Sequence, residues 1–203
     1  MKYMEHQVVV IHGGDNFGTY EEYISFLKNF EIESLDYFTQ RGWKDSLQEK
    51  LGKTFQVILP RMPNAFNARY IEWELWFKKL IPFLTDNVIF VGHSLGGIFL
   101  AKYLSQNKFP GKIAATFLLG APFDDEGSDE PLLDFALPES LDLFATQGGK
   151  IFVYHSADDP VVNYFQQRKY LKALPSAEAV TFDGKEHFGQ EEFPELVDAL
   201  RKV

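Results

Sequence analysis

The sequence predicts an α/β fold of three layers, in which a mostly parallel, six-stranded sheet carries helices on both faces. Short apolar runs bounded by turn residues alternate with longer stretches whose apolar residues recur at helical spacing. Such alternation is typical of parallel strands joined by right-handed crossover helices. With 203 residues, 45% of them hydrophobic, the chain can bury one core, and we expect a single domain over residues 1–203.

The six expected strands are short and rich in β-branched and aromatic residues. The first, at residues 7–11, runs into His12, Gly13 and Gly14, which predicts a buried strand that ends in a tight loop. The other strands are expected over residues 55–60, 88–91, 113–119, 150–154 and 179–182.

The helices are expected where apolar residues lie three or four positions apart. The segment 20–38 is aromatic along one face, and we expect it to cover the sheet together with a helix at 43–51. Further helices are expected over residues 68–84, 95–104, 164–174 and 191–201. Asn163 and Gln166 have the spacing of a capping box at the start of the helix 164–174.

The composition excludes several classes of function. A net charge of −9 argues against a nucleic-acid partner, which would require a basic face. The absence of cysteine excludes disulfides and thiolate chemistry. No apolar run reaches the length of a membrane span and no leader is recognisable, so we expect no membrane partner and a cytoplasmic location.

Two glycine-containing turns match nucleotide-binding motifs only in part. Read from Gly13, the dinucleotide motif has Asp15 where the second glycine belongs, although Gly18 fits. A phosphate loop around Gly52 would require a glycine in place of Leu47. We therefore expect no cofactor and no metal.

The stretch 87–104 has the strongest functional pattern of the chain. Its strand runs into Gly92-x-Ser94-x-Gly96 and then into a helix. In this context the pattern is typical of a nucleophile elbow, in which serine occupies a strained turn and the glycines let strand and helix approach closely. The alternative is a glycine-bounded turn in which Ser94 only caps the helix. We predict that Ser94 is a nucleophile.

A serine hydroxyl requires a base, and the base requires a third group that orients it. His187 follows the last expected strand, and Asp158 and Asp159 follow the fifth. Ligands of parallel sheets bind beyond the carboxyl ends of the strands, where these side chains and Ser94 are all expected. Between the two carboxylates we predict Asp159, because Pro160 holds its backbone extended.

An oxyanion that forms on the substrate would require two backbone N–H donors. Leu95 supplies one at the start of the helix after Ser94, and Gly14 is the expected second donor. The remaining histidines are predicted to have structural roles. They are His6, His12, His93 and His155.

Five short motifs carry a resemblance to a known family. They are Val-Ile-His-Gly at 10–13, Leu-Pro-Arg-Met-Pro at 59–63, Val-Gly-His-Ser-Leu-Gly-Gly at 91–97, Ser-Ala-Asp-Asp-Pro-Val at 156–161 and Glu-His-Phe-Gly at 186–189. The chain resembles the small α/β-hydrolase serine hydrolases typified by retinoblastoma-binding protein 9 and the bacterial YdeN-like proteins. This resemblance implies a compact α/β-hydrolase fold with a minimal cap.

The resemblance also implies a catalytic triad at Ser94, Asp159 and His187, in the chain order that α/β-hydrolases use. The sequence departs from the family at 20–38, where extra residues precede the helix at 43–51. The function expected is hydrolysis of small carboxylic esters, with thioesters and activated amides as further candidates, so the expected partner is a small-molecule acyl substrate. The alternative is a non-catalytic interaction protein that retains the hydrolase fold.

The segment 124–149 combines leucines and phenylalanines with a dense negative charge. It has eight acidic residues and no lysine or arginine. These are Asp124, Asp125, Glu126, Asp129, Glu130, Asp134, Glu139 and Asp142. One interpretation is a small acidic lid that covers an apolar pocket and disfavours anionic substrates, and the other is a solvated loop.

Overall fold

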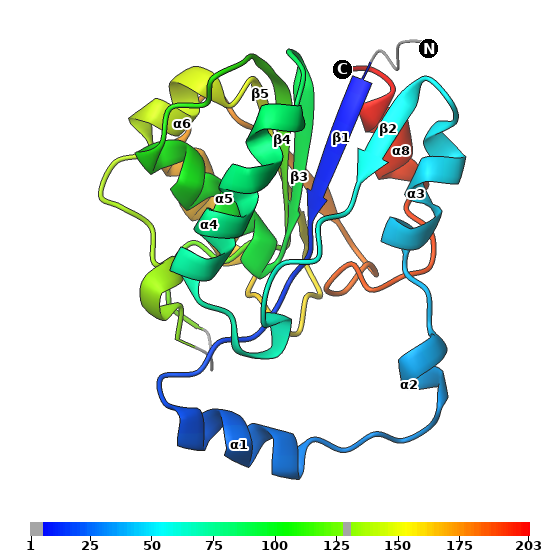
Figure 1. Cartoon of the computed structure of the whole chain (residues 1–203), viewed down its shortest axis with the longest axis vertical. Coiled ribbons are helices and arrows are strands. Elements are labelled where there is room, and N and C mark those ends of the chain that lie inside the picture. The colour runs from blue at the N-terminus through cyan, green and yellow to red at the C-terminus, as the bar shows by residue number, and fades with distance from the viewer. Residues whose placement is uncertain (1–5, 128–130) are drawn as a thin grey trace.

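The computed structural model describes residues 6–127 and 131–203, and a six-stranded sheet forms the centre of these ranges (Figure 1). The strands are β1 (His6–Ile11), β2 (Phe55–Ile58), β3 (Val88–His93), β4 (Ile113–Leu119), β5 (Lys150–Ser156) and β6 (Glu178–Phe182). They lie in the order β2-β1-β3-β4-β5-β6, and every neighbouring pair is parallel. The predicted fold class is confirmed, and the described sheet is entirely parallel.

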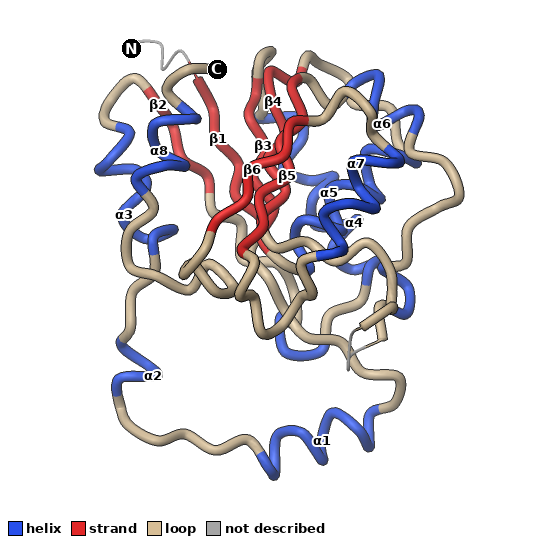
Figure 2. The backbone as a smooth tube through the Cα atoms, turned by 180° about the vertical axis from the view of Figure 1, so that it is seen from behind, coloured by secondary structure: helices blue, strands red, loops and turns tan. Residues whose placement is uncertain are grey.

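Helices cover both faces of the sheet and enclose two cores (Figure 2). One face carries α4 (Tyr70–Leu80), α5 (Leu95–Gln106), α6 (Asp142–Gln147) and α7 (Phe165–Ala173). The other face carries α3 (Trp43–Leu51) and α8 (Pro194–Leu200). Trp73 and Phe99 are fully buried in the larger core, and Leu47 and Leu196 are buried in the smaller one.

Prolines set two helix boundaries that differ from the predicted ones. The helix expected over 68–84 ends at Leu80 and continues as a 3-10 turn (Ile81–Phe83), because Pro82 lacks the N–H that an α-helix needs at this position. The helix expected over 191–201 begins at Pro194, whose fixed φ suits the first helical position. None of the helices in the described ranges combines the length and the apolar character that a membrane span requires.

The predicted capping box at the start of α7 is wrong. The side chain of Asn163 does accept a hydrogen bond from the N–H of Phe165, at 3.1 Å. The side chain of Gln166, however, points away from the helix start, and its Oε1 accepts from the N–H of Phe123 at 2.9 Å. Gln166 is almost fully buried, and its amide binds the connection after β4 instead of the start of the helix.

The prediction that the segment 20–38 covers the sheet is wrong. It forms α1 (Tyr20–Asn29) and a short α2 (Asp36–Thr39), which contain no buried residue and extend away from the sheet (Figure 1). The aromatic rings contact each other instead, with centroids 5.0 Å apart for Phe17 and Phe26 and 5.2 Å apart for Phe26 and Phe30. Both faces of the sheet are already covered by other helices, so no place remains for α1. We call residues 17–42 the aromatic arm.

The described part of 124–149 is ordered and contributes to the core. It contains a 3-10 turn (Leu133–Phe135) and α6, and the side chains of Phe135 and Phe144 are fully buried in the larger core. A purely solvated loop would not bury these rings. Two of the eight acidic residues, Asp129 and Glu130, lie outside the described residues.

Candidate active site

Ser94 lies at the junction of β3 and α5 in a strained backbone conformation. Its φ of 54° and ψ of −125° are unusual for a residue other than glycine. A Cβ on Gly92 would lie only 2.5 Å from the carbonyl oxygen of Gly96, and a Cβ on Gly96 would collide with the carbonyl oxygen of Ile11. Glycine at 92 therefore lets β3 approach the start of α5, and glycine at 96 lets α5 approach the end of β1, which is the geometry of a nucleophile elbow.

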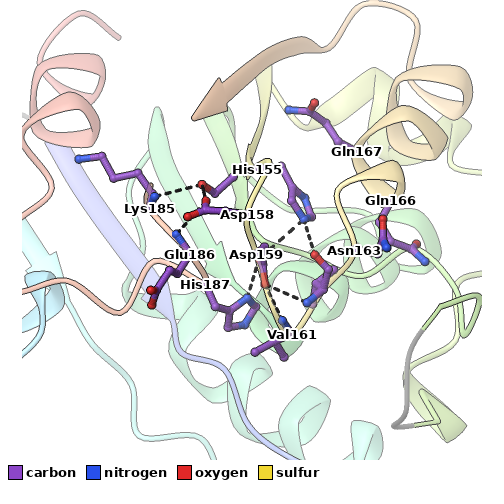
Figure 3. Close-up of polar contacts among 12 residues, drawn as sticks. His155, Asp158, Asp159, Val161, Asn163, Gln166, Gln167, Lys185, Glu186 and His187 are labelled. Atoms are coloured by element: carbon purple, nitrogen blue, oxygen red, sulfur yellow. Dashed lines mark hydrogen bonds and ion pairs between the residues drawn. The ribbon is translucent and has the colours of Figure 1, made fainter. Parts of the chain in front are cut away.

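His187 and Asp159 come together from the loops after β6 and β5 (Figure 3). The distance between His187 Nδ1 and Asp159 Oδ2 is 2.8 Å. The side chain of Asp159 is fully buried, and its other oxygen accepts hydrogen bonds from the N–H groups of Val161 and Val162, each at 2.9 Å. A carboxylate only accepts, so Nδ1 of His187 carries the proton and Nε2 is left to act as a base.

Asp158 has different partners from those of its neighbour Asp159. It is exposed, and its carboxylate accepts from Ser156 Oγ at 2.5 Å and from the N–H of Glu186 at 3.3 Å. The hydrogen bond from Ser156 is the main cause that lowers the pKa of Asp158 below its ordinary value. Of the two adjacent carboxylates, Asp159 is thus the one in contact with the His187 ring.

Ser94 also borders a pocket at this edge of the sheet. Gly14 and Leu95, the two predicted oxyanion donors, line the same pocket. A Cβ on Gly14 would lie 2.6 Å from the carbonyl oxygen of Ala65, so the loop has room only for glycine there. The N–H of the next residue, Asp15, is used in a 2.8 Å hydrogen bond to that same oxygen of Ala65. The rest of the lining combines apolar side chains with polar groups, and its residues are Asn16, Pro122, Gly127, Leu132, Pro160, Val161 and Val162.

The side chain of His93 connects the Ser94 turn to the His187 loop. His93, the residue before Ser94, is buried, and its Nε2 lies 2.7 Å from the carbonyl oxygen of His187. The rings of His93 and His187 have centroids 4.9 Å apart. Among the described residues no hydrogen bond joins the Ser94 hydroxyl to the His187 ring, and such bonds often tighten only when substrate is present.

Two histidines that were predicted to be structural support the loops of the site. His12 donates from Nδ1 to the carbonyl of Gly13 at 2.6 Å and accepts from the N–H of Met62 at 2.9 Å. His155 is fully buried beside Asp159 and donates from Nε2 to the carbonyl oxygen of Val162 at 2.8 Å (Figure 3). Burial is the main cause that lowers the pKa of both imidazoles, which favours their neutral forms.

Lys44 is a residue of this site that sequence reasoning missed. Its Nζ lies 3.1 Å from Nδ1 of His93. No local pattern marks Lys44, because its partner lies 49 residues further along the chain. Across the described ranges, no group of three or more His, Cys, Asp and Glu side chains is arranged to hold a metal ion.

Comparisons with known proteins show the family and the fold of this chain. A family model described as serine hydrolase matches residues 37–199. The ydeN gene product of B. subtilis has 19% sequence identity to this chain, covers 97% of both chains and superposes with a TM-score of 0.74. A YdeN-like hydrolase from Pectobacterium atrosepticum has 18% identity, covers 98% of this chain and 90% of its own, and has a TM-score of 0.66.

A structure from the archaeon Nitrososphaera gargenis, reported in a study of carboxylesterases, is also similar. It has 17% identity and a TM-score of 0.61, and the match covers 98% of this chain and 89% of the other. At these identities the likeness establishes the α/β-hydrolase fold alone. A comparison with curated protein sequences gives no significant match.

Proposed function

The chain belongs to the serine hydrolase family and is an enzyme of this type, and we propose that it cleaves small carboxylic esters through an acyl-enzyme on Ser94. The observation that carries the proposal is the 2.8 Å contact between His187 Nδ1 and Asp159 Oδ2, at the edge of the sheet where Ser94 occupies its strained turn. In this assignment Ser94 is the nucleophile, His187 the base and Asp159 the group that orients it.

The proposed reaction has two halves. In the first, Ser94 Oγ attacks the carbonyl carbon of the ester while its proton passes to His187 Nε2, and the alcohol then leaves with that proton. In the second, His187 takes a proton from water, the resulting hydroxide attacks the acyl-enzyme, and the acid leaves as Ser94 regains its proton. Asp159 stabilises the imidazolium in both halves, and the amides of Gly14 and Leu95 stabilise the oxyanion.

The lining of the pocket supports a small, uncharged acyl group. Leu132, Pro160 and Val161 present apolar surface near Ser94 beside polar groups such as the Asn16 side chain, and the described lining contains no lysine or arginine. Apolar contacts combined with a few convergent polar groups are typical of small-molecule sites. Thioesters and activated amides remain further candidates, because they react through the same tetrahedral intermediate.

The acidic segment should discriminate against anionic esters only weakly. Lys169 of α7 forms ion pairs with Asp124 and with Glu126, each at 2.6 Å, and so neutralises part of the charge that the segment carries. We expect kcat/KM for a neutral ester to exceed that for its carboxylated analogue by about twofold to threefold at low salt and by less at high salt. A preference for the anion would contradict the electrostatic part of the proposal.

The decisive experiment uses a fluorophosphonate probe, which labels activated serine nucleophiles. The wild-type protein should be labelled and should hydrolyse p-nitrophenyl esters of short acids, with a rate that depends on acyl length. Ser94→Ala should lose both properties, whereas Ser105→Ala, on the same helix α5, should retain them. Equal labelling of wild type and Ser94→Ala would contradict the assignment of the nucleophile.

A further inference from the structure

We propose that Lys44 is a positioning residue for His187 and that it acts through His93. This inference rests on the proposed function of Ser94 and His187 and adds a residue to their site. Lys44 lies in the first turn of α3, His93 at the end of β3 and His187 in the loop after β6. Three elements that are distant in the chain thus meet in one line of hydrogen bonds.

The direction of these hydrogen bonds follows from the donors and acceptors available. The carbonyl oxygen of His187 can only accept, so Nε2 of His93, 2.7 Å away, carries the proton. In a neutral imidazole the other nitrogen then has a lone pair, and Nδ1 of His93 accepts from Nζ of Lys44 at 3.1 Å. Lys44 therefore holds the ring of His93 from its other nitrogen and reinforces the tautomer that binds the backbone of His187.

The loop that carries His187 needs such support from outside. Glu186 and Phe188, on either side of His187, have φ values of 45° and 56°, which are costly for residues other than glycine. Trp43, next to Lys44, binds the same loop directly: its Nε1 donates to the carbonyl of Phe188 at 3.0 Å, and its N–H donates to that of Gln190 at 3.0 Å. The start of α3 thus holds the carbonyl groups of Phe188 and Gln190 directly. Through Lys44 and His93 it also holds the carbonyl group of His187.

The charges around Lys44 favour this arrangement near neutral pH. Burial lowers the pKa of Lys44 to about 8, and the charge of Asp45 opposes this shift. Burial, with the charge of Lys44 second, lowers the pKa of His93 well below its ordinary value. His187 and His12 are the other titratable groups close to His93. Below pH 8 a charged ammonium therefore donates to a neutral imidazole, and charge-assisted hydrogen bonds are about twice as strong as neutral ones.

The proposal predicts that the activity of the wild-type enzyme falls on the alkaline side. When Lys44 loses its proton above about pH 8, its hydrogen bond to His93 weakens, and kcat for p-nitrophenyl butyrate should fall. Lys44→Arg keeps a donor that stays protonated, so its kcat should not fall in this range. A wild-type kcat that is constant from pH 7 to 9.5, or an equal fall in Lys44→Arg, would overturn the proposal.

Removal of the donor should affect the chemical step more than substrate binding. We expect Lys44→Met to lower kcat about 10- to 100-fold at pH 7.5, because the base is misplaced, and to change KM by less than about threefold. Lys53→Met is the matched control, since Lys53 is an exposed lysine just beyond α3, and it should have wild-type kcat. A Lys44→Met enzyme with wild-type kcat would refute the positioning role.

An NMR measurement separates this inference from the proposed function. Ring nitrogen shifts should show His93 as the Nε2–H tautomer in the wild type at pH 7, and the shift of Nδ1 should change in Lys44→Met, where this nitrogen loses its hydrogen bond. An Nδ1–H form in the wild type, or an unchanged ring in the variant, would overturn the inference whether or not the protein is an esterase. Failure of the wild type to react with the fluorophosphonate probe would instead contradict the proposed function and leave the NMR result standing.

Discussion

Two connections leave the pocket edge of the sheet, and they differ in how far their aromatic side chains are buried. The aromatic arm, between β1 and α3, contains no buried residue in either of its helices, and Leu35 is 80% exposed. The connection between β4 and β5 buries Phe135 and Phe144 completely. Both segments combine apolar rings with acidic residues, so composition does not explain the difference.

The difference follows from the surface that each segment meets. The connection after β4 packs against α5, and its Phe135 ring contacts the rings of Tyr70 and Trp73 on α4. The aromatic arm leaves a sheet whose two faces are already covered by other helices (Figure 2). An amphipathic helix is buried only where an apolar surface is available to it. The comparison predicts that the strand ends and the connection after β4 are sensitive to substitution and that the arm is tolerant.

The largest difference between the two regions should appear in catalysis. Ser94→Ala should lower kcat about 10⁴- to 10⁶-fold, since no other group replaces the nucleophile, and should leave folding intact. Leu35→Ala in the arm should keep wild-type kcat, because that side chain lies in solvent. Steady-state kinetics with p-nitrophenyl butyrate measures both. Appreciable turnover by Ser94→Ala would contradict the assignment of Ser94 as the nucleophile.

The adjacent carboxylates should differ almost as clearly. Asp159→Asn should lower kcat about 10³- to 10⁴-fold, because an amide cannot stabilise the imidazolium or enforce its tautomer. Asp158→Asn should have a much smaller effect, since Asp158 contacts Ser156 and not the His187 ring. The comparison requires kcat of both variants under the same conditions, and the opposite ranking would assign the orienting role to Asp158.

Stability should also separate the two connections. Phe144→Ala should reduce the free energy of unfolding by about 3–5 kcal/mol, since removal of a fully buried ring leaves a cavity. Phe26→Ala in the arm should cost less than about 1 kcal/mol, because its ring is only partly buried against other arm residues. Urea denaturation of the two variants gives both values. Similar losses would mean that the arm packs on the body in solution.

The smallest effect concerns the pH dependence of stability at Lys44. Its pKa is about 8 in the folded protein and 10.5 in the unfolded chain, so between these values the unfolded state binds more protons and wild-type stability rises with pH. Lys44→Met lacks this contribution. Its free energy of unfolding relative to wild type should therefore fall by about 3 kcal/mol between pH 7.5 and 10.5. Parallel stability curves would contradict the lowered pKa.

Local sequence patterns sufficed to predict most of the fold. All six strands were expected at their observed places, because β-branched runs that end in turns depend only on nearby residues. The turn around Ser94 was predictable for the same reason, since Gly92 and Gly96 act on their own backbone. Pro160 likewise favoured Asp159, the carboxylate that the structure places beside His187. The capping box was predicted wrongly, because Gln166 binds a segment more than 40 residues away.

The sequence by itself thus determined the order of the six strands and of most helices, the strained turn at Ser94 and the set of polar residues at one edge of the sheet. Only the tertiary structure decided that the aromatic arm stays exposed and that Lys44 meets His93. The first depends on whether any sheet surface is left uncovered, and the second on a contact across 49 residues. Neither is encoded in a local pattern, because packing brings together side chains whose separation in the chain carries no periodic signal.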